Sequence, residues 1–206
     1  MERPGQKIIT PSAWGICCPG PSLGLYKTQK KILQDNPACL VAVNGAILLD
    51  AFKFDYWVMQ DIEVFETIIK KADISRFYAT RLWIPRRWLI DIPKDYDRLN
   101  SHFQVFYKEA FPAESIEAFN QIIPFGHYIN WRESTIFPAI ALAILSGARD
   151  IRLYGADMGG QGYFIEGLEN YRTQHTDRRW TNERHWFDCL AKECGKQGII
   201  ITRDGT

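Results

Sequence analysis

The stretch Gly15-Ile-Cys-Cys-Pro-Gly-Pro-Ser-Leu-Gly24 decides the fold that we expect for this chain. An apolar run from Trp14 to Cys18 is broken at once by Pro19-Gly20-Pro21-Ser22. This pattern predicts a buried strand followed by a tight turn whose backbone can approach a ligand. A second apolar run, Cys39 to Val43, ends on the polar residue Asn44. Two such strands predict a nucleotide-binding crevice at the carboxyl edge of a parallel sheet.

Short apolar runs alternate with segments of helical spacing along most of the chain. Strands are predicted at 15–18, 40–43, 54–59, 77–84, 150–155 and 199–202. Helices are predicted at 23–34, 62–71, 135–145 and 181–196. Helices that alternate with strands apolar on both faces cover a parallel sheet on both sides. The pattern therefore predicts an α/β fold with a mostly parallel sheet.

The chain length fits one domain, residues 1–206. Residues 86–126 carry Pro93, Pro112 and Pro124 and show little periodicity. We expect this segment to be an insertion of loops and short elements that shapes an acceptor site. A weak strand is predicted at 103–107 within it.

Composition and charge exclude several classes of protein. Lys and Arg number 25 and Asp and Glu 24, so the net charge of +1 gives no global signal for nucleic acid or membrane. No window reaches the roughly 18 apolar residues of a membrane span, and no apolar signal-peptide core follows the first residues. The five cysteines lack zinc-ligand spacing. We therefore expect reduced thiols in a cytoplasmic protein.

The predicted exits of the first two strands carry candidate nucleotide-binding residues. The Gly20-Pro21-Ser22 turn can place backbone N–H groups and the Ser22 hydroxyl against a phosphate. It is not a Walker A motif, because no Gly-Lys-Ser/Thr follows. The alternative is a plain turn in which Ser22 caps a helix. Asn44 can hydrogen-bond a base, ribose or phosphate, or can simply shape an Asx turn.

Two carboxylates follow later strands. Asp61 is a candidate metal ligand or acceptor for sugar hydroxyls, and its alternative role is to cap the helix that begins at Ile62. Asp157 follows Gly155 in a glycine-rich loop, where a carboxylate faces the predicted crevice. It is a candidate ribose ligand, metal ligand or general base, and its alternative role is to structure the loop.

Further candidates precede the last two predicted helices. Arg132, Ser134 and Thr135 can clamp a phosphate at a helix start, or cap that helix. His175 lies in a polar segment without a regular period, which fits a flap that carries a general base or a solvated loop. Arg178 and Arg179 belong to an Arg/Trp cluster that suits a polyanion with stackable bases, a nucleotide diphosphate or a solvated face.

The order of these motifs resembles a known superfamily. Pro-Gly-Pro-Ser-Leu follows the first predicted strand, Val-Asn the second, Asp-Tyr-Trp-Val…Asp accompanies the third, and Ser-Gly-Ala-Arg-Asp-Ile-Arg-Leu-Tyr-Gly-Ala-Asp stands near the end. This order resembles bacterial sialyltransferases that act on lipooligosaccharide, together with archaeal hydroxymethyl-dihydropterin pyrophosphokinase-like proteins and small phage-encoded relatives. The resemblance covers most of the chain and is weak at 86–126.

The resemblance implies a Rossmann-like domain of the glycosyltransferase-A type. It also implies that the Gly20-Pro21-Ser22 turn and Asn44 hold a nucleotide donor, with Arg132 and Ser134-Thr135 near its phosphate. The catalytic histidine of the sialyltransferases lies in the flap before the last helix, where His175 is the nearest match. Pro19 and Gln60-Asp61 replace asparagines of the sialyltransferases. An Asp at the third strand is closer to the pyrophosphokinase-like branch and favours a divalent metal.

Three functions follow as hypotheses. The first is a glycosyltransferase that moves a sugar from a nucleotide-sugar donor to a hydroxyl of a glycan or of a modified base in DNA. His175 or Asp157 would act as the base, and Arg178 or Arg179 would stabilise the leaving phosphate. The second is a pyrophosphokinase-like transfer from ATP, with Mg²⁺ or Mn²⁺ held by Asp61 and Asp157. The third is a nucleotide-binding module without catalysis.

Overall fold

A single parallel sheet organises the part of the chain that the computed structural model describes, residues 13–71, 80–83, 113–128, 134–159 and 177–204. The strand order is β4-β3-β2-β1-β5-β6, and every neighbouring pair is parallel. The strands are β1 Trp14–Cys17, β2 Cys39–Val43, β3 Tyr56–Val58, β4 Arg81–Trp83, β5 Asp150–Tyr154 and β6 Ile200–Arg203. The predicted α/β, Rossmann-like fold class is confirmed.

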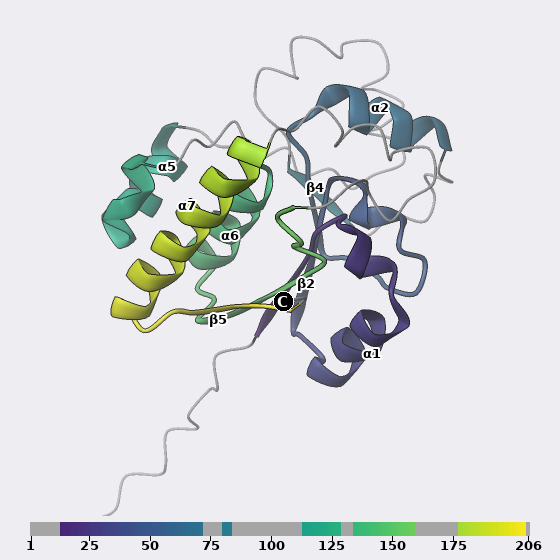
Figure 1. The fold of residues 1–206 in the computed structure, drawn as a ribbon, viewed down its shortest axis with the longest axis horizontal. Helices are drawn as coiled ribbons and strands as arrows, with labels where there is room; N and C mark the ends of the chain where they lie inside the picture. The colour runs from purple at the N-terminus through teal and green to yellow at the C-terminus, as the bar shows by residue number, and fades with distance from the viewer. Residues whose placement is uncertain (1–12, 72–79, 84–112, 129–133, 160–176, 205–206) are drawn as a thin grey trace, which may run out of the picture.

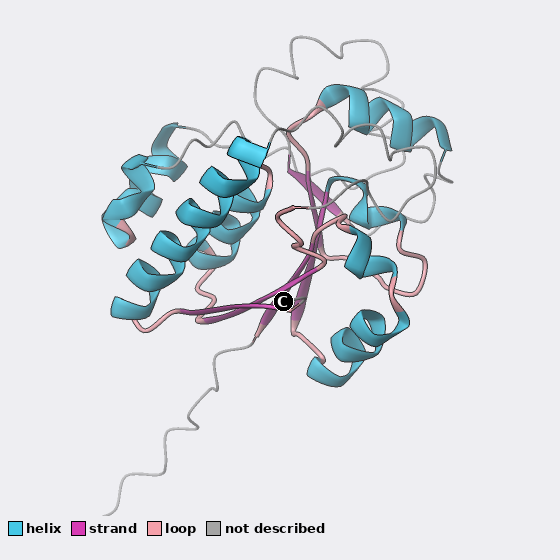
Figure 2. Cartoon of the chain, viewed as in Figure 1, coloured by secondary structure: helices cyan, strands magenta, loops and turns pink. Residues whose placement is uncertain are grey.

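Helices cover both faces of this sheet. The α-helices are α1 Tyr26–Asp35, α2 Ile62–Lys71, α5 Ala113–Ile122, α6 Ile136–Leu145 and α7 Asp177–Lys196. Short 3₁₀ helices are η1 Pro21–Gly24, η2 Asn44–Leu48 and η4 Pro124–Tyr128. Figures 1 and 2 show α6 and α7 on one side of the sheet and α1 on the other. None of the described helices is long and apolar enough to span a membrane.

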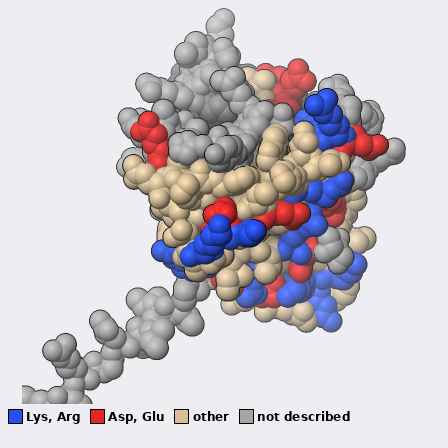
Figure 3. All heavy atoms as spheres, turned by 60° about the vertical axis from the view of Figure 1, so that its left-hand side comes forward, with Lys and Arg blue, Asp and Glu red and all other residues tan. Residues whose placement is uncertain are grey.

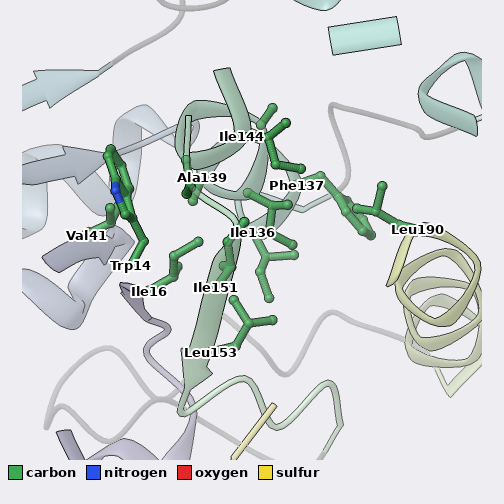
Figure 4. Close-up of a cluster of buried hydrophobic side chains, with 14 of the residues drawn as sticks. Trp14, Ile16, Val41, Ile136, Phe137, Ala139, Ile144, Ile151, Leu153 and Leu190 are labelled. Atoms are coloured by element: carbon green, nitrogen blue, oxygen red, sulfur yellow. The ribbon is translucent and has the colours of Figure 1, made fainter. Parts of the chain in front are cut away.

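Two hydrophobic clusters, one on each face, form the core. Side chains alternate between the faces along a strand, so Ile16 and Val41 join the cluster under α6 and α7, while Cys17 and Leu40 join the other. Figure 4 shows the first cluster, in which Phe137 of α6 points toward Leu190 of α7. Helix α6 is apolar all round, as expected for a helix buried between a sheet and another helix.

Several element boundaries differ from the sequence predictions for identifiable reasons. The helix predicted at 23–34 is split, because Pro21 starts the 3₁₀ turn η1 and Leu25 then adopts an extended conformation before α1. Part of the segment predicted to be irregular forms the ten-residue helix α5. Helix α7 begins at Asp177, four residues before the prediction. The weak strand predicted at 103–107 lies outside the described residues.

The topology fixes where a site can lie. The chain adds β2, β3 and β4 on one side of β1 and then β5 and β6 on its other side, so the order of strands reverses at β1. All strands are parallel, so all of them end at one edge of the sheet, the carboxyl edge. Helices that connect parallel strands run back in the opposite direction, so they begin at this edge. In open α/β sheets, ligands bind here beside the point of reversal.

Candidate functional site

The loops that follow β1 and β5 are joined at the carboxyl edge. Cys18 N–H donates to the Tyr154 carbonyl at 2.7 Å, and Gly20 N–H donates to the Gly155 carbonyl at 3.0 Å. Ser22 N–H then donates to Asp157 Oδ2 at 2.9 Å. These bonds continue the pairing of β1 and β5 beyond the strand ends. Ser22 and Asp157 are therefore adjacent although 135 residues separate them in sequence.

Two glycines make this crossing possible. A Cβ on Gly20 would lie 2.3 Å from both the Gly155 carbonyl oxygen and Asp157 Oδ2. Gly155 has a φ of +67°, and its Cβ would lie 2.3 Å from the Cys18 carbonyl oxygen. Both positions exclude any side chain, and Gly155 also needs the left-handed conformation that glycine adopts without strain. The structure shows that these glycines let the two loops approach each other. Nucleotide binding by them stays a prediction.

Asn44 begins η2 directly after β2, the strand next to β1. Its φ of +48° is left-handed, which Asn tolerates better than most residues. Its carbonyl accepts a hydrogen bond from Trp57 Nε1 at 2.8 Å, and Trp57 is fully buried. The sequence analysis missed Trp57, although a Trp in a predicted buried strand signals an indole that needs an acceptor.

Two side-chain oxygens at this edge are buried without a hydrogen-bond partner among the described residues. They are Ser22 Oγ and Asn44 Oδ1. An unsatisfied buried polar group costs about 1–3 kcal/mol, so native proteins keep few of them. Because β2, β1 and β5 are consecutive in the sheet, Ser22, Asn44 and Asp157 follow three adjacent strands. This grouping, which we call the carboxyl-edge triad, is the arrangement that a bound polar ligand would complete.

Asp61 has the capping role that the sequence analysis gave as its alternative. Its Oδ1 accepts hydrogen bonds from Glu63 N–H at 3.1 Å and Val64 N–H at 3.3 Å at the start of α2. It follows β3, which is three strand positions from β5 and so about 14 Å from the exit that carries Asp157. That separation does not fit one metal ion held by both carboxylates. The described residues contain no group of three or more His, Cys, Asp or Glu that could hold a metal.

Helix α7 is tied to the start of α6 and to the loop after β5. Ser134 Oγ donates to Glu183 Oε1 at 2.5 Å, and Glu183 is buried. Arg184 Nη1 donates to the Met158 carbonyl at 2.9 Å. The Ser134 hydroxyl thus donates its proton to a partner within the protein. Thr135 is the N-cap residue of α6, but its side chain makes no capping hydrogen bond. Glu183 was not predicted, because nothing local distinguishes it from the other acidic residues of this helix.

The arginines at the start of α7 differ in exposure. Arg178 is exposed, Arg179 is half-buried, and Trp180 is buried. A buried Trp180 does not offer its ring to a base, so this part of the predicted Arg/Trp cluster is no stacking surface. Figure 3 shows basic and acidic side chains interspersed on the face in view. Arg132 and His175 lie outside the described residues.

The fold and the carboxyl-edge triad together define a Rossmann-like α/β protein with a candidate site at the strand exits. No protein-family model and no curated protein matches the chain. A solved structure that is similar to it is the sialyltransferase CstII from Campylobacter jejuni, in complex with the substrate analogue cytidine-5'-monophosphate. The two share 14% identity and a TM-score of 0.44, over 93% of this chain and 79% of that one.

Proposed function

We propose that this protein is a glycosyltransferase that binds a nucleotide-sugar donor at the carboxyl-edge triad and transfers the sugar to an acceptor hydroxyl. The main support is the pair of buried, unpartnered oxygens, Ser22 Oγ and Asn44 Oδ1, beside Asp157 at the exits of adjacent strands. The order of sequence motifs, which resembles the sialyltransferase superfamily, supports sugar transfer rather than another nucleotide chemistry.

The chemistry of the triad favours the hydroxyl groups of a ribose over a phosphate. Asn44 Oδ1 and the Asp157 carboxylate accept hydrogen bonds, and the Ser22 N–H is already taken by Asp157. A phosphate also only accepts hydrogen bonds, and its charge is repelled by a carboxylate. A ribose hydroxyl instead donates to such acceptors. We therefore place the ribose, rather than the phosphates, at Ser22, Asn44 and Asp157.

The phosphate groups of the donor would then lie toward the start of α7. A helix start offers free backbone N–H groups and the positive end of the helix dipole. Arg178 and Arg179 lie in the first turn of this 20-residue helix, and both can pair with phosphate oxygens. In this arrangement they stabilise the negative charge that develops on the leaving nucleotide.

Proton removal from the acceptor is assigned to His175, and Asp157 is assigned to binding. Asp157 uses Oδ2 to hold the Ser22 backbone, which suits a residue that orients the donor. Histidine is the side-chain type most often used for proton transfer near neutral pH. His175→Ala should therefore lower kcat with little change in donor affinity.

A thermal-shift screen with CMP, UDP, GDP and ATP and their sugar derivatives, with and without Mg²⁺, tests the proposal. One nucleotide family should stabilise the protein without metal, by about 2.7 kcal/mol at a ligand concentration of 100 Kd. The matching 2',3'-dideoxynucleotide should give a smaller shift if the ribose hydroxyls are recognised. Asp157→Asn should reduce the shift, and Asp188→Asn, an exposed control on α7, should not.

Three results would contradict the proposal. Stabilisation by ATP only in the presence of Mg²⁺ would favour the pyrophosphokinase-like alternative. An equal thermal shift with the dideoxynucleotide would mean that the carboxyl-edge triad does not bind the ribose hydroxyls. Donor binding without sugar transfer to any glycan or DNA acceptor would leave a binding module that does not catalyse.

A further inference from the structure

Exposed apolar side chains concentrate at the start and along the outer face of α1. Four large hydrophobic residues of the described part of the chain are exposed, and three of them lie within residues 25–33. They are Leu25, Tyr26 and Leu33, exposed by 47%, 79% and 65%. Single exposed apolar residues are ordinary, whereas a cluster marks an interaction surface.

Helix geometry places lysines in the same surface. Tyr26, Lys30 and Leu33 are spaced by four and three residues, so they form one stripe along the helix. The stripe lies opposite Thr28 and Ile32, the residues that α1 buries against the sheet. Lys27 flanks it and is exposed as well. We call Leu25, Tyr26, Lys27, Lys30 and Leu33 the α1 surface.

The charge of the α1 surface is entirely positive. Lys27 and Lys30 form no ion pair with any residue that the structure describes, and α1 contains one acidic residue, Asp35. Asp35 is already engaged by Lys31, Arg152 and Tyr154. Lys31 lies near Asp35 and Asp204 and is therefore not counted in the surface.

These features favour an anionic partner over a second copy of the chain. In a two-fold antiparallel pairing of α1 helices, Lys30 at the centre of the stripe would face its own counterpart, with no acidic residue on the surface to offset the repulsion. Figure 1 shows α1 at the periphery of the molecule. A peripheral helix with exposed Tyr and Leu beside unpaired lysines suits a lipid interface, where the apolar groups enter the headgroup layer and the lysines contact phosphates.

We propose that the α1 surface docks on anionic lipid bilayers. The inference is independent of the proposed function, because it concerns residues outside the carboxyl-edge triad. Sedimentation of the full chain with vesicles tests it directly. Binding to vesicles of phosphatidylcholine with phosphatidylglycerol should exceed binding to phosphatidylcholine alone by several-fold and should weaken as salt is raised.

Charge-reversal variants separate this surface from a general charge effect. Lys27→Glu/Lys30→Glu should abolish most of the vesicle binding. Lys70→Glu/Lys192→Glu changes the net charge equally at exposed lysines of α2 and α7, and should bind as the unmodified protein does. If the two double variants lose binding equally, the proposal is wrong.

Apolar variants test the other half of the surface. Tyr26→Ser/Leu33→Ser should reduce vesicle binding several-fold, while Ile200→Ser, at the exposed hydrophobic residue of β6, should leave it unchanged. Circular dichroism and thermal melting check that each variant is folded. Equal binding to neutral and anionic vesicles would overturn the proposal. So would dimerisation, seen as a molecular mass that doubles when the protein concentration is raised and that stays monomeric in Tyr26→Ser/Leu33→Ser.

Discussion

The two edges of the parallel sheet differ in how their buried polar groups are paired. Near the amino edge, where α1 ends, Asp35 accepts a hydrogen bond from the Tyr154 hydroxyl at 2.8 Å. It also pairs with Lys31 at 2.7 Å and with Arg152 at 3.0 Å. At the carboxyl edge, Ser22 Oγ and Asn44 Oδ1 have no partner among the described residues. The Asp35 group at the amino edge is thus paired within the protein, whereas these two oxygens at the carboxyl edge are the groups that the proposed ligand would pair.

Protonation supports this division. Burial and the neighbouring Asp35 raise the pKa of Tyr154 far above its usual value, so this side chain remains a hydrogen-bond donor. Burial acts to raise the pKa of Asp35, but hydrogen bonds from Lys31 and Tyr154 and the charge of Arg152 outweigh it and hold that pKa below its usual value. The ionised Asp35 fastens α1 to β5.

The largest effect on stability is expected from adding a side chain where the loops after β1 and β5 meet at the carboxyl edge. Gly155→Ala would force a Cβ to within 2.3 Å of the Cys18 carbonyl oxygen and 2.6 Å of Leu23 Cβ, in addition to left-handed strain. We expect a loss of about 2–4 kcal/mol in the free energy of unfolding, measured by urea denaturation.

Gly198→Ala separates steric exclusion from strain. Gly198 has a φ of +69°, close to the +67° of Gly155, but nothing lies within 4 Å of its Cβ position. We expect this control to lose about 1 kcal/mol, from strain alone. Equal losses of stability in the two variants would mean that the loops after β1 and β5 do not meet tightly at Gly155. The geometry described for the carboxyl edge would then be wrong.

A smaller effect is expected at the amino edge. Tyr154→Phe removes one donor to Asp35 and leaves Lys31 and Arg152 in place, so we expect a loss of about 1–2 kcal/mol at neutral pH. Nucleotide-induced stabilisation should not change, because we propose that the nucleotide binds at the opposite, carboxyl edge.

The same network predicts an acid dependence. A carboxyl group whose folded pKa is lowered adds stability that is present above its unfolded pKa of about 3.9 and is lost as the pH falls through the folded value. The free energy of unfolding of the unmodified protein should therefore decrease as the pH is lowered from about 5, and Asp35→Asn should make that decrease less steep. An unchanged slope in Asp35→Asn, measured by urea denaturation across pH, would show that Asp35 is not the group responsible.

The sequence was sufficient to predict the carboxyl edge and the positions of three residues along it, whereas their role in binding stays a prediction. Alternation of strands and helices implies a parallel sheet, and a parallel sheet places every strand exit at one edge, so Ser22, Asn44 and Asp157 were expected there. Capping by Asp61 was also foreseeable, because it involves residues two and three positions away.

Contacts between distant segments could not be predicted in this way. The Ser134–Glu183 bond depends on how α6 packs against α7, and the Tyr154–Asp35 bond joins residues 119 positions apart. Helix α5 was missed because Pro112 and Pro124 suggested irregular structure, whereas both prolines lie just outside its bounds, where a helix tolerates them. Such features depend on tertiary packing, on which local spacing carries no information.

The smallest effect on stability, and the sharpest on binding, is expected from the unpartnered oxygens. Ser22→Ala removes a buried hydroxyl that has no partner, so the free energy of unfolding should stay within about 0.5 kcal/mol or rise by up to about 1 kcal/mol. Asn44→Gly keeps the left-handed conformation at φ +48° and removes Oδ1, with an equally small effect.

Both variants should nevertheless lose most of the nucleotide-induced thermal shift, because a ligand is the expected partner of these oxygens. Ser146→Ala and Asn36→Gly are matched controls: Ser146 is exposed beyond α6, and Asn36 has a similar φ of +42° beyond α1. The controls should keep the full shift. If Ser22→Ala instead destabilised the protein by the amount typical of a lost hydrogen bond, its hydroxyl would have a partner within the protein. The carboxyl edge would then be as complete as the amino edge.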